Sequence, residues 1–271
     1  MFLAHKKSVA GNTFSVLPQY NKFILANHDR LELISNVCPH QKSIISTVSG
    51  SGNRICPYHN WTFTLDGQPV TSGRTEHYCK NQTALQTQSV YIWNSLVFSQ
   101  PVNFKIPEDF SNLKLVETRV DLVKSNHINI MDLFLDVDHI PTVHQGVYDQ
   151  IGITDFSDIK WEYYTNGSTQ FVYDKQGLAA AWIAVYPYTM IEWQRGSLFV
   201  TVIEKQNTDQ SNVHVFKYTD DSDQWDLNNT VWETAWKQDR EQAELINEVN
   251  FENLEIQKLH YRNYLKINGT T

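Results

Sequence analysis

Two segments of the sequence, NVCPHQKSII at residues 36–45 and RICPYHNWTF at residues 54–63, decide what its first part can be. Short apolar runs separated by polar, glycine-containing clusters surround both segments, a pattern typical of β-strands joined by loops. Thiolates and imidazoles bind soft and borderline metals. We therefore expect two metal-binding loops on an all-β domain. Each segment contributes one cysteine and one histidine to a set of four: Cys38, His40, Cys56 and His59.

The distribution of these four residues distinguishes between two metal centres. Zinc takes two thiolates and two imidazoles in a tetrahedral site, but zinc fingers usually place the cysteines together and the histidines together. Here each loop supplies one of each. One iron can then take Cys38 and Cys56 while a second takes His40 and His59, which is the ligand set of a Rieske [2Fe–2S] cluster. The sequence favours the cluster, with zinc as the alternative.

Composition excludes several classes of function. The chain has 271 residues, with 22 Lys and Arg against 30 Asp and Glu, a formal net charge of −8. An acidic chain is a poor partner for nucleic-acid phosphates or anionic membrane surfaces, so we expect neither. No apolar run is long enough for a signal or a membrane span, and three cysteines cannot form a disulfide framework. We expect a cytoplasmic protein in which Cys79 is a structural thiol.

Two prolines in QPVNFKIP, residues 100–107, favour extended backbone and mark a domain boundary. We expect one domain at residues 1–100 and a second at residues 101–271. In the second domain, residues 129–139 are predicted to be helical and residues 159–218 to form antiparallel strands. A long helix is predicted over residues 231–259, begun by a capping box that pairs Thr230 with Glu233.

A second set of possible metal ligands lies in DVDHIPTVH, residues 136–144. Asp136 and His139 are three residues apart, so on a helix they share one face. Pro141 disfavours helix at the residue before it, so we expect the chain to turn there and to bring His144 towards His139. Two imidazoles and one carboxylate bind non-haem Fe(II) and leave positions open for O2 and substrate.

The carboxylate of this triad is expected on the last predicted helix, where an apolar stripe includes one acid. The stripe consists of Trp232, Trp236, Asp239, Ala243 and Ile246. A carboxylate that faces a core needs a partner, because burying it bare is costly. A metal could serve, as could a salt bridge with Arg240 or Arg195. We favour the metal, with His139, His144 and Asp239 as ligands of a mononuclear Fe(II).

Together, these motifs resemble the Rieske non-haem iron oxygenases. Residues 56–67, CPYHNWTFTLDG, are close to the second cluster loop and following hairpin of that family. Residues 91–98, YIWNSLVF, are similar to the strand that closes its Rieske domain, and Gln238-Asp239 is similar to its carboxylate ligand. The resemblance implies an α+β chain: an N-terminal all-β Rieske domain, then a helix-grip (START-like) antiparallel sheet around a long C-terminal helix.

The sequence departs from the family in both cluster loops. The first loop continues Gln41-Lys42-Ser43, where the family commonly has arginine followed by glycine, and Asn60 replaces a usual glycine. All four cluster ligands remain in place. The resemblance spans nearly the whole chain, which we expect to be an unusually short member without the N-terminal helical extension.

The resemblance also implies how the two metal centres communicate. Asp136 matches the acid that bridges them: it would hydrogen-bond His139 in its own chain and reach a Rieske histidine, here His59, of a neighbouring subunit. That route implies a head-to-tail homotrimer. Asp132, one turn earlier, replaces a common asparagine. A separate reductase or ferredoxin would supply the electrons.

The implied activity is that of a terminal oxygenase acting with O2 on a small organic substrate, by hydroxylation, dihydroxylation or oxidative demethylation. Aromatic residues in the predicted sheet could hold an aromatic ring or a quaternary ammonium: Trp161, Tyr163, Trp182, Tyr186, Tyr188 and Trp193. Residues 185–190 loosely resemble the branch that acts on alkylamines. The alternative is a non-enzymatic Rieske redox or ligand-binding protein with a degenerate iron site.

Overall fold

The structure, a computed structural model, describes residues 1–9, 11–17, 19–20, 23–27, 30–70, 83–106, 109–157, 159–220, 223–246 and 256–269. They form two compact units, Phe2–Val102 and, with Met1, Asn103–Thr271. Cys79 lies outside the described residues. Within the described part of the chain, no helix is both long and apolar enough to cross a membrane.

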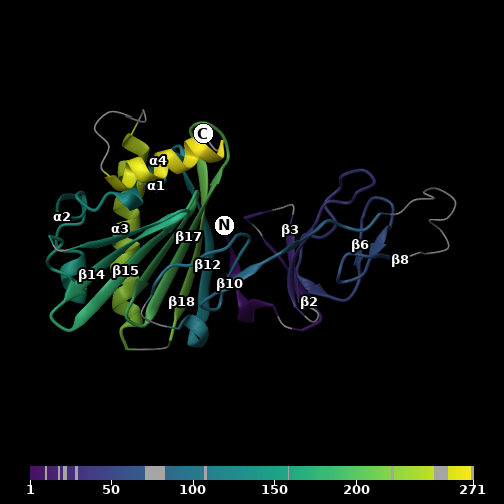
Figure 1. Ribbon diagram of the computed structural model, residues 1–271, viewed down its shortest axis with the longest axis horizontal. Helices are drawn as coiled ribbons and strands as arrows, with labels where there is room; N and C mark the ends of the chain where they lie inside the picture. The colour runs from purple at the N-terminus through teal and green to yellow at the C-terminus, as the bar shows by residue number, and fades with distance from the viewer. Residues whose placement is uncertain are drawn as a thin grey trace. The chain divides into compact units, whose positions relative to one another are not determined.

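Three small antiparallel sheets make up the unit Phe2–Val102 (Figure 1). The first contains β1 (Phe2–His5), β11 (Leu96–Phe98) and β10 (Tyr91–Trp93). The second contains, in order, β5 (Gly50–Ser51), β2 (Thr13–Val16), β3 (Phe23–Asn27), β4 (Leu31–Ser35) and β9 (Thr87–Ser89). The third contains β6 (Arg54–Ile55), β7 (Thr62–Phe63) and β8 (Pro69–Val70). A 3-10 turn, η1 (Lys6–Ser8), follows β1.

One strand expected in this unit is instead a hairpin. Residues 91–98 divide into β10 and β11, which pair with each other. The turn residues Asn94 and Ser95 have φ of 50° and 69°, the left-handed conformation of a tight hairpin turn, which asparagine tolerates well. The hairpin that the resemblance implies after the second cluster loop is present: β7 pairs with β8, and Gly67 between them has a φ of 83°.

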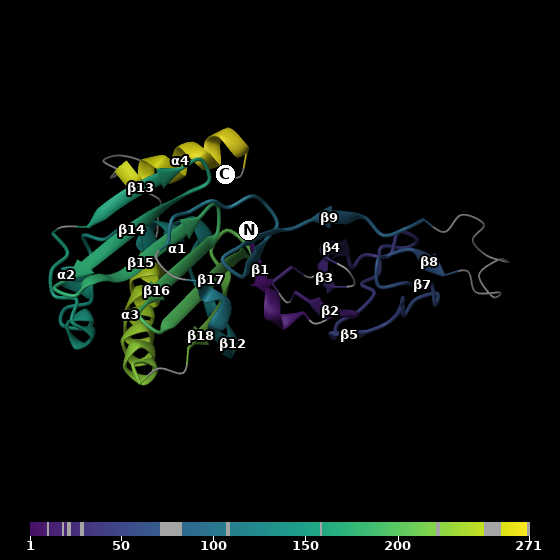
Figure 2. The same ribbon diagram turned by 60° about the horizontal axis from the view of Figure 1, so that its bottom comes forward.

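The unit Asn103–Thr271 is built on one seven-stranded antiparallel sheet (Figures 1 and 2). Its order is β12 (Lys114–Val123), β18 (Ser211–Thr219), β17 (Ser197–Lys205), β16 (Thr189–Gln194), β15 (Gly177–Val185), β14 (Gly167–Asp174) and β13 (Lys160–Tyr164). The helices are η2 (Phe110–Asn112), α1 (His127–Leu135), α2 (Ile140–Val143), η3 (Tyr148–Ile151), α3 (Trp225–Leu245) and α4 (Ile256–Asn268). The expected helix-grip arrangement is therefore present.

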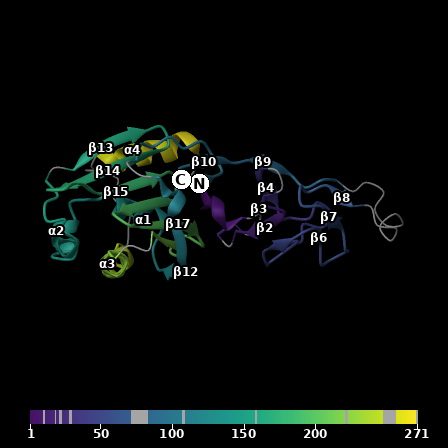
Figure 3. The ribbon, with the colours of Figure 1, turned by 90° about the horizontal axis from the view of Figure 1, so that it is seen from below.

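The helix α3 lies across one face of this sheet, and Figure 3 views it nearly end-on. It begins at Trp225, earlier than predicted, and ends at Leu245. The predicted capping box is wrong: Thr230 is inside the helix, where its hydroxyl donates to the Asp226 carbonyl. Glu233 faces the sheet instead. Of the remainder of the predicted helix, residues 247–255 lie outside the described residues, and α4 begins after them.

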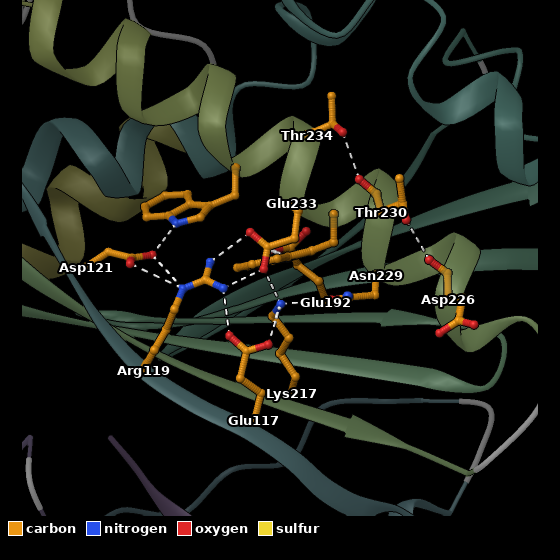
Figure 4. Close-up of polar contacts among 12 residues, drawn as sticks. Glu117, Arg119, Asp121, Glu192, Lys217, Asp226, Asn229, Thr230, Glu233 and Thr234 are labelled. Atoms are coloured by element: carbon orange, nitrogen blue, oxygen red, sulfur yellow. Dashed lines mark hydrogen bonds and ion pairs between the residues drawn. The ribbon is translucent and has the colours of Figure 1, made fainter.

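An ion cluster joins α3 to the edge of the sheet (Figure 4). Lys217 of β18 is fully buried, and its ammonium donates to Glu233 and lies 2.9 Å from Glu117. Arg119 of β12 also donates to Glu233. Asp121 also accepts from Arg119 at 3.1 Å, so two cations meet three carboxylates and the buried lysine is paired, as a buried charge must be. The cluster fixes the position of α3 on the sheet.

One row of directly opposed side chains crosses the sheet face that α3 covers. In strand order the row is Glu117, Lys217, Phe199, Glu192, Trp182, Gln170 and Trp161. Opposed residues of antiparallel strands point to the same face. The Phe199 ring stacks on Trp232 of α3, with centroids 5.1 Å apart, which identifies the face. This transverse row passes from the ion cluster into the interior beneath the helix.

Candidate functional site

The four predicted cluster ligands lie on two loops of six residues each, 38–43 and 56–61. Each loop is closed at its base by one β-pair: Val37 with Ile44 in the first and Ile55 with Thr62 in the second. The Asn36 side chain stabilises the closed end of the first loop. Its amide N–H₂ donates to the Ser46 carbonyl at 2.7 Å, and its amide oxygen accepts from the Ser46 N–H at 3.0 Å.

The two loops share one backbone design. The cysteine N–H donates to the carbonyl of the sixth residue at 2.8 Å in both loops: Cys38 to Ser43 and Cys56 to Trp61. The cysteine carbonyl accepts from the N–H of the fifth residue, Lys42 at 3.0 Å and Asn60 at 2.9 Å. Both fifth residues adopt positive φ, 59° and 58°. This conformation explains why glycine is common there in the family that the loops resemble.

The side chains of these loops divide into a buried sulfur side and an outer imidazole side. Cys38 and Cys56 are free thiols within an apolar core that includes Trp61. Burial raises the pKa of the Cys38 thiol, and the adjacent Cys56 raises it further. His40 is half-buried and His59 exposed, with ring centroids 4.6 Å apart. Two adjacent thiols behind two adjacent imidazoles fit the donor set of a Rieske cluster.

The second candidate site begins with a one-turn helix. His139 precedes α2 and His144 follows it; the Val143 N–H donates to the His139 carbonyl at 2.7 Å. The predicted helical face shared by Asp136 and His139 is wrong, because α1 ends at Leu135. Pro141 does not prevent helix at Ile140 either. It occupies the first turn of α2, where the backbone N–H that proline lacks would have no partner within the helix.

Three ligand atoms converge at this site. The Nε2 atoms of His139 and His144 are 2.9 Å apart, and they lie 3.2 and 3.0 Å from Asp239 Oδ1. Adjacent ligands of an octahedral ion, each about 2.1 Å from the metal, are about 3.0 Å apart. The three donors therefore fit one face of an octahedron. They are also the two-histidine, one-carboxylate set that suits Fe(II).

Asp239 comes from the middle of α3 and is buried there with Trp232, Trp236 and Ala243, as its spacing predicts. Ile246 follows the end of the helix and is exposed. The two arginines considered as salt-bridge partners of Asp239 face other acids. Arg195 pairs with Asp174, and Arg240 faces Asp121. Burial alone would raise the pKa of Asp239, but its hydrogen bonds to the two histidines lower it below its ordinary value. Burial lowers the pKa of His144, and Asp239 more than reverses this shift.

Gln238, which the sequence analysis named only beside Asp239, contacts one of the candidate metal ligands. Its Oε1 lies 2.8 Å from His144 Nδ1. An amide oxygen only accepts, so Nδ1 carries the proton and Nε2 is left with a lone pair for a metal. Because Gln238 adjoins Asp239, one turn of α3 supplies both a ligand candidate and the group that orients another.

Asp136 does not contact His139 as the resemblance implied. The His139 Nδ1 atom is buried with no hydrogen-bond partner among the described residues. The Asp136 carboxylate instead accepts from Lys258 of α4 at 2.8 Å and from the Asp138 N–H at 3.1 Å. Asp132 is bound in the same way by Arg262, one turn further along α4. The helix ends before Asp136, so its side chain points towards α4.

A small cavity, with about 30 Å³ of space open to water, adjoins the three converging ligand atoms. Besides those ligands it is lined by Leu133, Phe134, Asp136, Val137, Ile140, Tyr148, Gln170, Trp182, Met190 and Glu192. Of the six aromatic residues predicted to surround a substrate, Trp182 alone lines it. A larger hollow of about 530 Å³ shares Val137, Ile140, His144 and Tyr148 with this cavity.

Comparison with known proteins finds a family match over part of the chain and relatives of similar sequence. Residues 2–86 match the family described as the Rieske [2Fe-2S] domain. Putrescine 2-hydroxylase of Ralstonia nicotianae is 24% identical over 238 residues, 74% of this chain and 64% of that protein. The carnitine monooxygenase oxygenase subunit of Acinetobacter pittii is 25% identical over 205 residues, 64% of this chain and 55% of that protein. The matched region thus spans less than two thirds of either relative.

Solved structures share the fold along the whole chain. A quaternary ammonium Rieske monooxygenase in complex with L-carnitine superposes with a TM-score of 0.76 at 17% identity, covering 100% of this chain and 88% of that chain. Naphthalene 1,2-dioxygenase with bound indole gives a TM-score of 0.68 at 12% identity, covering 90% of this chain and 74% of that chain.

Proposed function

We propose that this chain, which has a Rieske [2Fe–2S] domain and the fold of the Rieske oxygenases, is the terminal oxygenase component of such a system. It would hydroxylate or oxidatively demethylate a small alkylamine with O2. The relatives support the substrate class, since their names specify putrescine and carnitine. Electrons would come from a separate reductase or ferredoxin.

The convergence of His139, His144 and Asp239 beside a cavity carries this proposal, because it occurs in a chain that also has a Rieske domain. A Rieske protein that only transferred electrons would need no such triad. Iron held by the triad would supply oxidation of a substrate C–H bond by O2, with electrons from the cluster. Gln238 would hold His144 in the tautomer that binds metal, and Asp239 would supply the negative charge.

The route between the two centres is proposed to cross between subunits of a head-to-tail homotrimer. Cys38, Cys56, His40 and His59 would hold the cluster. Asp136 would accept a hydrogen bond from His59 of the partner subunit. The low cysteine count supports a reducing, cytoplasmic location for such a cluster-bearing enzyme.

Iron counting on the reconstituted protein tests the proposal. We expect three iron atoms per chain, and oxidised product when the reduced protein receives O2 and an alkylamine. His139→Ala should retain two irons and the visible spectrum of the cluster but form no product, because one ligand of the triad is lost. Two irons per wild-type chain, with no product from any substrate, would support a non-enzymatic Rieske protein instead.

A further inference from the structure

Three neighbouring residues of the transverse row line the cavity beside the triad. Gln170, Trp182 and Glu192 lie directly opposite one another on β14, β15 and β16. They therefore point to one face of the sheet, below α3 and next to Asp239. Of the three, only Trp182 was expected from the sequence to contact a substrate.

Glu192 is a buried carboxylate without a cationic partner. Glu192 is only 8% exposed, and its carboxylate accepts one hydrogen bond, from the Trp232 indole N–H at 2.9 Å. Burial raises the pKa of Glu192 to about 7, although the hydrogen bond opposes the shift. The other acids of the cavity are paired: Asp136 with Lys258 and Asp239 with two histidines. No lysine or arginine among the described residues pairs with Glu192, and only His144, when its ring is protonated, opposes the charge of that carboxylate.

Gln170 provides a second unsatisfied acceptor. The residue is 1% exposed, and its amide N–H₂ faces the Phe134 carbonyl at 3.5 Å. A carbonyl can only accept, so the amide nitrogen must be on that side. The Gln170 Oε1 atom is then left buried with no partner among the described residues. An unsatisfied buried acceptor is costly, and a ligand with N–H groups would satisfy it.

The approach to this cavity favours cations. The residues that line the cavity and the adjoining hollow include no lysine or arginine. The hollow instead has three acids, Asp138, Asp149 and Asp155. On the aromatic side, Trp182 stacks on Phe156 with centroids 6.4 Å apart and meets Tyr148 edge to face at 5.7 Å. Negative charge and aromatic surface together attract and hold an organic cation.

We infer that Gln170, Trp182 and Glu192 recognise a protonated alkylamine that retains N–H groups, rather than a quaternary ammonium. Glu192 balances the positive charge, Gln170 Oε1 accepts an N–H bond, and Trp182 contacts the carbon chain. A quaternary nitrogen has no N–H to donate and leaves the Gln170 acceptor unsatisfied. This inference rests on the proposed function and names the substrate class of the same site.

Titration calorimetry on the metal-loaded protein tests the inference with three probes. They are 1,4-diaminobutane, its neutral counterpart 1,4-butanediol, and the quaternary amine choline. We expect the diamine to bind more tightly than either of the others. Glu192→Gln keeps an acceptor for Trp232 but removes the charge, and it should weaken diamine binding roughly thirtyfold or more. The affinity for the diol should not fall.

Two further variants complete the test. Glu241→Gln removes the same charge from an exposed position on α3 and should leave diamine affinity unchanged. Gln170→Leu should weaken diamine binding roughly tenfold and leave choline binding unchanged, and it tests the inference independently if Glu192→Gln does not fold. Full diamine affinity in both Glu192→Gln and Gln170→Leu overturns the inference, as does tighter wild-type binding of choline than of the diamine.

The inference and the proposed function fail in different ways. If the wild-type protein binds the diamine through Glu192 but oxidises no amine, the recognition site stands and the proposed function does not. If the protein oxidises an amine while Glu192→Gln binds it with unchanged affinity, the oxygenase stands and this recognition site is refuted.

Discussion

The two candidate metal centres are built in opposite ways. The cluster loops are local structures: each fits six residues between the members of one β-pair, and each fixes its cysteine through two backbone hydrogen bonds. The triad is assembled over a long range, because Asp239 follows His144 by about a hundred residues and arrives on α3. Spacing along the chain therefore encodes the first centre, whereas the second depends on how a helix docks on a sheet.

The docking of α3 shows what the long-range centre requires. Lys217 and Arg119 hold Glu233, while Trp236 donates to Asp121 at 2.7 Å. Trp236 is buried one turn before Asp239, and Glu233 flanks that buried face, so these contacts set the depth and rotation of Asp239 over the sheet. The triad thus relies on polar contacts distant from the metal, and the cluster loops rely mainly on their own backbone.

The largest expected effect is at the local centre. Cys56→Ser should abolish the broad visible absorption and the low-g-average EPR signal of the reduced cluster, since serine does not replace a thiolate on iron. Because the triad is in the other unit, its mononuclear iron should still bind. Cys79→Ser is the control and should keep both signals. A Cys56→Ser protein with an unchanged spectrum would show that the ligand assignment is wrong.

The same contrast explains how far the sequence predicts the protein. The loop spacing was sufficient to expect the paired cysteines and histidines, since their geometry is local. The apolar stripe was sufficient to predict that Asp239 is buried. The sequence could not predict that α1 ends at Leu135, because residues 136–139 contain no glycine or proline to mark the end. It also could not predict the contacts of Gln238 and Glu192, whose partners, His144 and Trp232, lie far away in the sequence.

An intermediate effect is expected at Asp136, where the two centres would communicate. Asp136→Asn keeps the size of the side chain but loses one acceptor oxygen, so it should retain both metals. In a single turnover with O2 and substrate, its reduced cluster should be oxidised at least tenfold more slowly, because the proposed hydrogen bond from His59 of the partner subunit to this carboxylate would be weakened.

Asp132→Asn provides the matched control for this variant. Asp132 and Asp136 each pair with one cation of α4, Arg262 and Lys258 respectively. If the slower oxidation arose from a loosened α4, both variants would show it. We expect it in Asp136→Asn alone. Equal rates in the two variants, or loss of mononuclear iron from Asp136→Asn, would remove Asp136 from the route between the metals.

The smallest effect concerns the one point at which the two cluster loops differ in strain. Lys42 and Asn60 occupy the same loop position with nearly the same positive φ. Asparagine tolerates this conformation, whereas lysine is disfavoured there by roughly 1–2 kcal/mol. Glycine relieves that strain, but its larger loss of conformational entropy on folding lowers the stability by about 0.5–1 kcal/mol. Lys42→Gly should therefore stabilise the domain by about 0.5–1 kcal/mol, and Asn60→Gly should not.

Thermal loss of the visible absorbance of the cluster, measured at a fixed scan rate, detects this difference as a shift of a few degrees. Two variants separate strain from charge, since Lys42→Gly also removes a cation beside the cluster. Lys42→Gln removes the charge but keeps the strain, and it should give no gain. Lys42→Asn copies the second loop and should recover part of the gain. A gain in Lys42→Gln equal to that of Lys42→Gly would show that charge, and not backbone conformation, limits the first loop.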